Sequence, residues 1–177
     1  MGMCSEIVFV ISNKAEVFGL ERAAKANVPS TVISNKDFTT RDEFDSALHA
    51  ELMKHNVEIV CLAGFMRILT AEFVSKWKGR LLNIHPSLLP KHKGIRAQKD
   101  ALEAGDKESG CTVHFVDENV DTGAIIVQEV VPILENDTVE SLSERIHKAE
   151  HVAFPKALRL VASEYVKLND HGKTEWI

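Results

Sequence analysis

Cysteine, glycine and proline are scarce in this 177-residue sequence, and acidic residues outnumber basic ones. The three cysteines, Cys4, Cys61 and Cys111, are far apart and lack the paired spacing of a zinc or redox motif. Two of them lie in or beside apolar runs, so we expect buried, reduced thiols. A formal net charge of -5 disfavours nucleic acid and anionic membranes as partners, because both require a basic face. Without a long apolar run or a secretory signal, we expect a cytoplasmic protein.

Strands alternate with helices along the first half of the sequence. The apolar patterns predict strands over 5–11, 30–33, 59–63, 81–85, 112–116 and 124–131, and helices over 19–26, 71–77 and 97–104. A capping box at 40–43 predicts a longer helix, and Asp137 or Thr138 should begin the last one, which we expect Pro155 to kink or restart. This order predicts an α/β fold with a doubly wound, mostly parallel sheet and an antiparallel C-terminal edge. We expect one domain over 1–177, because no repeat or change in composition marks a boundary.

Polar side chains lie at the end of the strand predicted over 81–85. Asn83 and His85 are two residues apart, so they project to the same side of the strand. Because ligands bind at the carboxyl ends of strands in open parallel sheets, the pair is a candidate catalytic site, although both side chains could equally bind the backbone of a turn. The acidic loop 117–123 would ordinarily be solvated, but Asp121 would favour a protonated imidazole if it lay beside His85.

Two further patterns have competing interpretations. The run 147–151 matches the inverted zincin pattern His-x-x-Glu-His, yet two surface histidines on an amphipathic helix are favoured because no third ligand follows. The run 63–69 leaves a strand end with large apolar side chains. It could form the wall of a pocket for a flat aromatic ligand, or Phe65, Ile68 and Leu69 could pack in the core.

Several motifs occur together and in order: 11–14, Leu-Ala-Gly-Phe-Met-Arg-Ile-Leu over 62–69, Asn-Ile-His-Pro-Ser-Leu-Leu-Pro over 83–90, 112–116 and 121–123. Through them the whole chain resembles the glycinamide ribonucleotide formyltransferases of purine biosynthesis. The resemblance implies a Rossmann-like formyltransferase fold. It also implies direct, metal-free transfer of a formyl group from the co-substrate 10-formyltetrahydrofolate to the amine of glycinamide ribonucleotide.

The resemblance implies roles for individual residues. Asn83 and protonated His85 match the donors to the oxyanion of the tetrahedral intermediate, and Asp121 matches the carboxylate that supports His85. The positions matched to folate binding are Arg41, Met66, Arg67, Ile68, Leu69, Asn83, Val116, Asp117, Glu118, Asn119, Val120 and Asp121. Those matched to substrate binding are His147, Lys148, Ala149 and Glu150. Glu150 matches a ligand of the ribonucleotide sugar hydroxyls, which displaces the zincin interpretation.

One departure from the family lies at the N-terminus. Family members begin with an additional strand, a glycine-rich turn that binds the substrate phosphate, and a helix, and residues 1–7 supply none of these. We therefore expect an N-terminally incomplete fold with reduced stability or with strand exchange in a homodimer.

Three other functions compete with this one. A formyltetrahydrofolate deformylase uses a related Asn, His and Asp set with water as the nucleophile, although the residues after His85 resemble the transferase. Transfer to methionyl-tRNA would require an RNA-binding domain and a basic surface. A non-catalytic folate-binding fragment would follow from the missing phosphate loop.

Overall fold

The computed structural model describes residues 5–177, so Cys4 lies outside the described residues. The chain divides into two compact units. The smaller unit comprises Ser5–Glu58 and Leu69–Lys76, and the larger unit contains Ile59–Ile68 and Trp77–Ile177. None of the helices in the described part combines the length and the apolar character that a membrane span needs. The single domain expected over 1–177 stays a prediction.

The smaller unit consists of a parallel strand pair and its helices. In order these are β1 (Val10–Ser12), α1 (Phe18–Lys25), β2 (Ser30–Val32), a 3-10 turn (Asn35–Asp37), α2 (Arg41–Lys54) and α3 (Ala71–Lys76). The predicted capping box begins α2: the Glu43 amide donates to Thr40 Oγ1 at 3.2 Å, and the Thr40 amide donates to Glu43 Oε2 at 3.1 Å. Phe44, Leu48 and Leu52 bury one face of this helix, as their spacing predicts.

The larger unit is built on a four-stranded sheet in the order β3-β4-β5-β6. Its elements are β3 (Val60–Leu62), β4 (Leu81–His85), α4 (Ala97–Glu103), β5 (Glu108–Phe115), β6 (Ile125–Pro132), α5 (Val139–Ala162), β7 (Val166–Leu168) and β8 (Thr174–Trp176). β3 runs parallel to β4, whereas β5 and β6 are antiparallel to their neighbours and β7 pairs with β8 in a hairpin. The parallel pairs followed by antiparallel strands confirm the predicted α/β fold with an antiparallel C-terminal edge.

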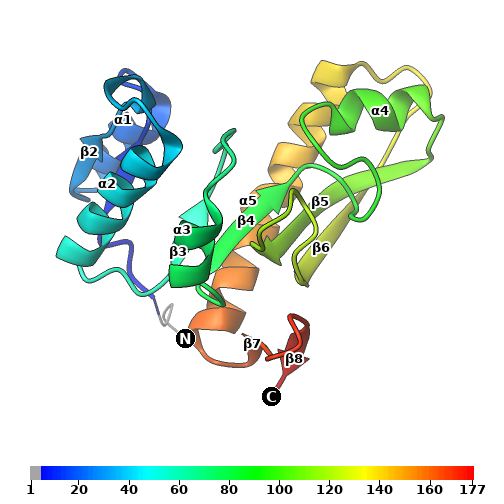
Figure 1. Cartoon of the computed structure of the whole chain (residues 1–177). Coiled ribbons are helices and arrows are strands. Elements are labelled where there is room, and N and C mark those ends of the chain that lie inside the picture. The colour runs from blue at the N-terminus through cyan, green and yellow to red at the C-terminus, as the bar shows by residue number, and fades with distance from the viewer. Residues whose placement is uncertain (1–4) are drawn as a thin grey trace. The chain divides into compact units, whose positions relative to one another are not determined.

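The core of the larger unit lies between its sheet and α5. Figure 1 shows this long helix running along the sheet beside β4, β5 and β6. Leu142 and Ile146 of α5 are fully buried against Leu82 and Val113 of the strands. Every residue of β5 except Glu108 is buried, because the strand is paired on both edges. β4 and β5 are the two central strands of this sheet.

Three expectations are wrong in detail. Cys111 is buried and free, but Cys61 is exposed because β3 is the outermost strand of its sheet. α5 begins after the N-cap Thr138 as predicted and is one helix through the exposed Pro155, so the expected restart is wrong, while the alternative of a kink stays a prediction. The first strand covers only Val10–Ser12, and the short β7–β8 hairpin was not predicted.

Gly110→Ala should destabilise the protein by about 2 kcal/mol, because overpacking a close contact forces the backbone to move. A Cβ at Gly110 would overlap the Glu129 carbonyl oxygen of β6 and lie 2.8 Å from Leu88 Cδ2. Gly19 of α1 has open space around the same position. Gly19→Ala is therefore the matched control, and it should raise stability by up to about 1 kcal/mol. Urea unfolding measures both, and equal midpoints for the two variants would contradict the packing described.

Candidate functional site

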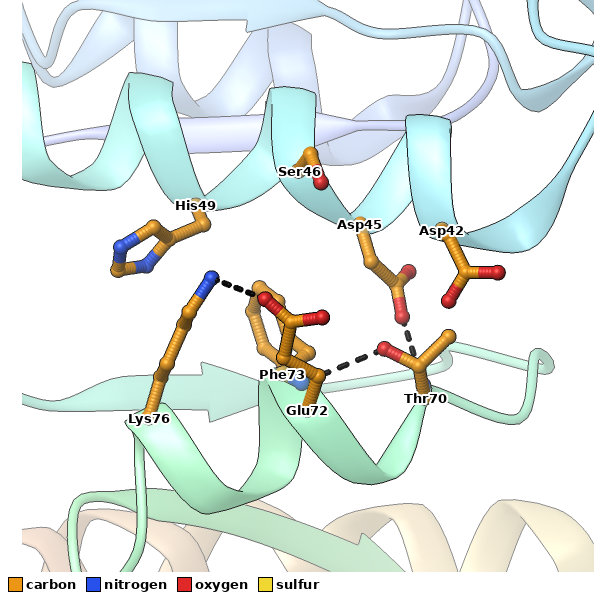
Figure 2. A pocket seen from close by; sticks show the side chains of 8 residues that line it. All are labelled: Asp42, Asp45, Ser46, His49, Thr70, Glu72, Phe73 and Lys76. Atoms are coloured by element: carbon orange, nitrogen blue, oxygen red, sulfur yellow. Dashed lines mark hydrogen bonds and ion pairs between the residues drawn. The ribbon is translucent and has the colours of Figure 1, made fainter.

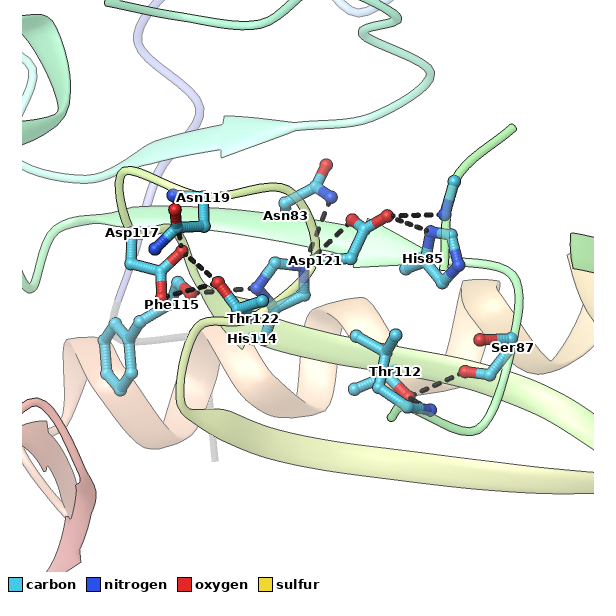
Figure 3. A network of polar contacts seen from close by, with 12 residues as sticks. Asn83, His85, Ser87, Thr112, His114, Phe115, Asp117, Asn119, Asp121 and Thr122 are labelled. Atoms are coloured by element: carbon cyan, nitrogen blue, oxygen red, sulfur yellow. Dashed lines mark hydrogen bonds and ion pairs between the residues drawn. The ribbon is translucent and has the colours of Figure 1, made fainter. Parts of the chain in front are cut away.

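The register of β4 against β5 assembles a polar cluster at the end of β4. Asn83 lies opposite His114, and His85 lies opposite Thr112. Figure 3 shows these side chains together with Asp121, which reaches them from the loop between β5 and β6. The side chains of His85, His114 and Asp121 are at most 10% exposed. The predicted trio of Asn83, His85 and Asp121 therefore lies in one place.

Both ring nitrogens of His85 contact acceptors. Nδ1 lies 3.3 Å from Asp121 Oδ2, and Nε2 lies 2.9 Å from the backbone carbonyl oxygen of His92. A ring protonated on both nitrogens satisfies both contacts, whereas a neutral ring leaves one acceptor without a proton. The alternative in which His85 binds the backbone of a turn is thus correct for one nitrogen, while the other faces a carboxylate.

The loop that carries Asp121 is folded onto itself. Asp117 Oδ1 accepts a hydrogen bond from the Asn119 amide at 3.1 Å and another from Thr122 Oγ1 at 2.7 Å. Asp121 adopts a left-handed φ of 53°. Gly123 then passes so close to the Phe115 carbonyl that a Cβ would overlap it, which explains the glycine. This closed geometry turns Asp121 toward His85 rather than toward solvent.

His114 is a site residue that the sequence did not reveal. Its Nδ1 donates to the Phe115 carbonyl oxygen at 2.8 Å, so its Nε2 accepts from Asn83 Nδ2 at 3.3 Å. Burial lowers the pKa of His114, which keeps the ring neutral and able to accept. The contact occupies one N–H of the Asn83 amide and leaves the second for a ligand. A histidine in an otherwise apolar strand was the available signal.

The turn after His85 is held by buried hydrogen bonds. Thr112 Oγ1, fully buried, donates to the Ser87 carbonyl at 2.7 Å and accepts from the Leu89 amide at 3.1 Å. Gln128 Nε2 donates to Thr112 Oγ1 and to the Leu89 carbonyl oxygen, each at 2.9 Å. Neither Thr112 nor Gln128 was predicted as part of the site. Both fix the path by which the chain leaves His85.

The residues matched to substrate binding lie on α5. His147 and Lys148 are exposed, and Ala149 and Glu150 are half-buried. Burial raises the pKa of Glu150, while positive charge on His147, His151 or His85 would act in the opposite direction. Among residues 5–177 no group of three His, Cys, Asp or Glu side chains is arranged to hold a metal ion.

The residues matched to folate binding fall in both units. Met66 and Ile68, which follow β3, are 79% and 59% exposed, so the interpretation of Ile68 as a core residue is wrong. Arg67, between these two residues, is half-buried. In the loop after β5, Val116 and Asp117 are half-buried, and the next three residues are exposed: Glu118, Asn119 and Val120. Arg41, the first residue of α2, and Leu69 belong to the smaller unit.

A hollow between α2 and α3 contains none of the predicted residues. Figure 2 shows it within the smaller unit, where the Thr70 amide donates to the buried carboxylate of Asp45 at 2.6 Å and Lys76 pairs with Glu72. Its free volume is about 10 Å³, which is close to the smallest space that a single water molecule occupies. It is too small for an organic ligand.

The fold and the cluster together indicate a class of protein. An amide donor and a buried His–Asp pair at the end of a parallel strand are suited to stabilising an oxyanion during acyl transfer or hydrolysis. The sequence profile of the formyl transferase family matches residues 2–158. The chain belongs to this family.

Individual relatives agree with this assignment. The chain is 83% identical over 176 residues to the trifunctional purine biosynthetic protein adenosine-3 of Chironomus tentans, covering 99% of the chain and 13% of that protein. It thus spans about an eighth of the length of that relative. The crystal structure of phosphoribosylglycinamide formyltransferase from Anaplasma phagocytophilum has a TM-score of 0.90 and 44% identity, covering 98% of this chain and 82% of that one. This likeness confirms the Rossmann-like formyltransferase fold.

A more distant structure shares the fold. A formyltetrahydrofolate deformylase from Pseudomonas syringae has a TM-score of 0.87 but only 25% identity, covering 97% of this chain and 56% of that one. The chain is therefore less similar in sequence to this deformylase than to the transferase from Anaplasma phagocytophilum.

His114 should make stability depend on pH. Its folded-state pKa is lowered, so its contribution is complete above the ordinary histidine pKa of about 6.5 and is lost as the pH falls from there toward the folded value. The free energy of unfolding should therefore fall more between pH 7.5 and 5 in the wild type than in His114→Gln. The exposed His171 provides the control, and His171→Gln should keep the wild-type slope. Identical slopes for all three proteins in urea titrations would contradict a buried, neutral His114.

Proposed function

We propose that the chain transfers the formyl group of 10-formyltetrahydrofolate to the amine of glycinamide ribonucleotide. One observation carries the proposal: His85 lies between the Asp121 carboxylate and a backbone carbonyl, beside an Asn83 amide with a free N–H. These groups form a set of hydrogen-bond donors for an oxyanion, and the set is already in place before any ligand binds. Membership of the formyl transferase family supplies the reaction class.

The transfer can be written with the two substrates and these side chains. The substrate amine attacks the formyl carbon, forming a new C–N bond and converting the carbonyl oxygen into an oxyanion. The free N–H of Asn83 and an N–H of His85 stabilise this charge, and Asp121 stabilises the imidazolium. Collapse re-forms the carbonyl and breaks the bond to N10 of the folate. The net proton transfer is from the attacking amine to N10.

His85 changes its partner during this reaction. Before the substrate binds, its Nε2 faces the His92 carbonyl. An oxyanion accepts a hydrogen bond more strongly than a neutral carbonyl does, so it displaces the His92 carbonyl from that N–H. The closed cluster is therefore compatible with catalysis, because only one hydrogen bond must be exchanged.

We assign the binding roles on the same basis. The exposed segment from Met66 and the loop after β5 would hold the pterin ring through backbone groups. Arg41 belongs to the smaller unit, and its match to a position near the acidic tail of the folate stays a prediction from the family resemblance. The half-buried Glu150 would accept hydrogen bonds from the sugar hydroxyls of the ribonucleotide. A cytoplasmic location and strand exchange between copies of the chain stay predictions.

Two alternatives lead to different chemistry. In a deformylase, water would attack and formate would be released without the ribonucleotide. In a folate-binding protein without catalysis, the His85 cluster would bind the formyl group and leave it intact. The residues that follow His85 favour transfer, because 86–90 resembles the transferases.

Calorimetry and a product assay separate these functions. The purified chain is titrated separately with a stable 10-formyltetrahydrofolate analogue and with glycinamide ribonucleotide, and then incubated with both natural substrates. Binding of both ligands and formation of formylglycinamide ribonucleotide support the proposal. Formate release without the ribonucleotide would indicate a deformylase, and folate binding without either product would indicate a binding protein.

His85→Ala should lower turnover by about 10³-fold, a loss typical of removing a preorganised oxyanion donor. The dissociation constant for the formyl folate analogue should change by less than about threefold, since most of that ligand would bind elsewhere. His85→Gln tests the same loss with less change in volume. His171→Gln, on the β7–β8 turn, serves as the control and should keep normal turnover. Near-normal turnover by both His85 variants would exclude the mechanism.

A further inference from the structure

The loop from Lys91 to Gly94 contacts both members of the His85–Asp121 pair. The His92 carbonyl oxygen lies 2.9 Å from His85 Nε2, and the Gly94 amide donates to Asp121 Oδ2 at 3.0 Å. Two backbone groups of one short segment thus clamp the pair, one by accepting and the other by donating. The position of this segment sets the surroundings of both side chains.

His92 holds an unfavourable backbone conformation. Its φ is 50°, in the left-handed region, where the Cβ of a non-glycine residue approaches the following carbonyl oxygen and strains the backbone. Such a conformation persists only where neighbouring contacts hold it. The side chain provides one of these contacts, because His92 Nε2 lies 2.9 Å from Asp106 Oδ2. Both side chains are less than one-fifth exposed.

Asp106 is a firm anchor for this contact. It follows Gly105, which ends α4 with a φ of 68°, and its own amide donates to the Ala101 carbonyl oxygen at 3.2 Å. The hydrogen bond from His92 is the largest effect on the Asp106 carboxyl and lowers its pKa, burial opposes it, and the hydrogen bond from Lys91 at 3.3 Å lowers the pKa further. The carboxylate therefore stays ionised and ties the loop to the end of α4.

We propose that His92 is a positioning residue, whose side-chain hydrogen bond with Asp106 holds its own carbonyl against His85 Nε2. The carbonyl then keeps a proton on that nitrogen until a formyl oxygen replaces it, since an acceptor stabilises the charged ring. As a role in catalysis, this inference rests on the proposed function. The coupling between His92 and His85 is a property of the free protein and can be measured without any substrate.

Several charges act on the two histidines. His85 is faced by Asp121 from the loop after β5, and it interacts electrostatically with His114 of β5 and Glu150 of α5. His92 is faced by Asp106 and lies next to Lys91, which shares the same carboxylate. Substituting His92 or Asp106 leaves Asp121, His114 and Glu150 in place. A change in the titration of His85 would therefore report a change in the position of the loop from Lys91 to Gly94.

The test compares His92→Gln and Asp106→Asn, which weaken the His92–Asp106 contact from opposite sides. Glu103→Gln is the matched control, because it also converts a carboxylate to an amide. Glu103 is the last residue of α4, and its partner Lys99 is exposed and 3.6 Å away. The titration of the His85 ring is followed by NMR in the free protein, and kcat/KM is followed across pH. Urea midpoints establish that each variant is folded.

In both His92→Gln and Asp106→Asn the titration of the His85 ring should move to lower pH. The alkaline limb of the kcat/KM profile should move with it, with about a threefold to tenfold loss at the alkaline end and less than about a twofold loss at the acid end. Glu103→Gln should match the wild type. A merely structural role for His92 would lower kcat/KM equally at every pH.

An unchanged His85 titration in folded His92→Gln and Asp106→Asn would overturn the proposal. If the titration moves but the wild type transfers no formyl groups, the proposed function fails while the coupling of His92 to His85 stands. The two failures are therefore distinguishable.

Discussion

In the pairing of β4 with β5, a shift of one residue would turn every side chain of one strand to the opposite face of the sheet. The observed register places Asn83 opposite His114 and His85 opposite Thr112. Both pairings place a residue of β5 where it supports the site on β4. His114 orients the Asn83 amide, and Thr112 fixes the turn after His85. The buried strand β5 and the helix α5 hold this register, so the core of the larger unit determines the geometry of the cluster.

Buried charge is the main energetic cost of this arrangement. Asp121 is removed from water, and its carboxylate is compensated by His85 and by the Gly94 amide. Such a pair is unfavourable unless additional hydrogen bonds satisfy it. The segment from Lys91 to Gly94, which is tied to Asp106, supplies those bonds, and the loop closed by Asp117 holds Asp121 in place. The cluster is consequently preorganised by backbone groups, and only the His92 carbonyl has to give up its hydrogen bond when charge develops on a ligand.

Regular patterns made much of this structure predictable. The capping box of α2, the start of α5 at Thr138 and the placing of Asn83 and His85 on one side of a strand follow from local sequence patterns and are confirmed. The contact of Asp121 with His85 depends on a left-handed residue and on the close passage of Gly123, which no spacing reveals. His114 and Thr112 became visible only through the pairing register. Cys61 was misjudged because exposure depends on whether a strand lies at the edge of its sheet.

The central claim is that a formyl oxygen binds within the cluster at the end of β4. A crystal structure of the protein with glycinamide ribonucleotide and a stable 10-formyltetrahydrofolate analogue tests this most directly. The formyl oxygen should lie within hydrogen-bonding distance of Asn83 Nδ2 and of His85 Nε2, with the His92 carbonyl displaced from that nitrogen. A formyl group bound away from Asn83 and His85, with the His85–His92 contact intact, would contradict the account.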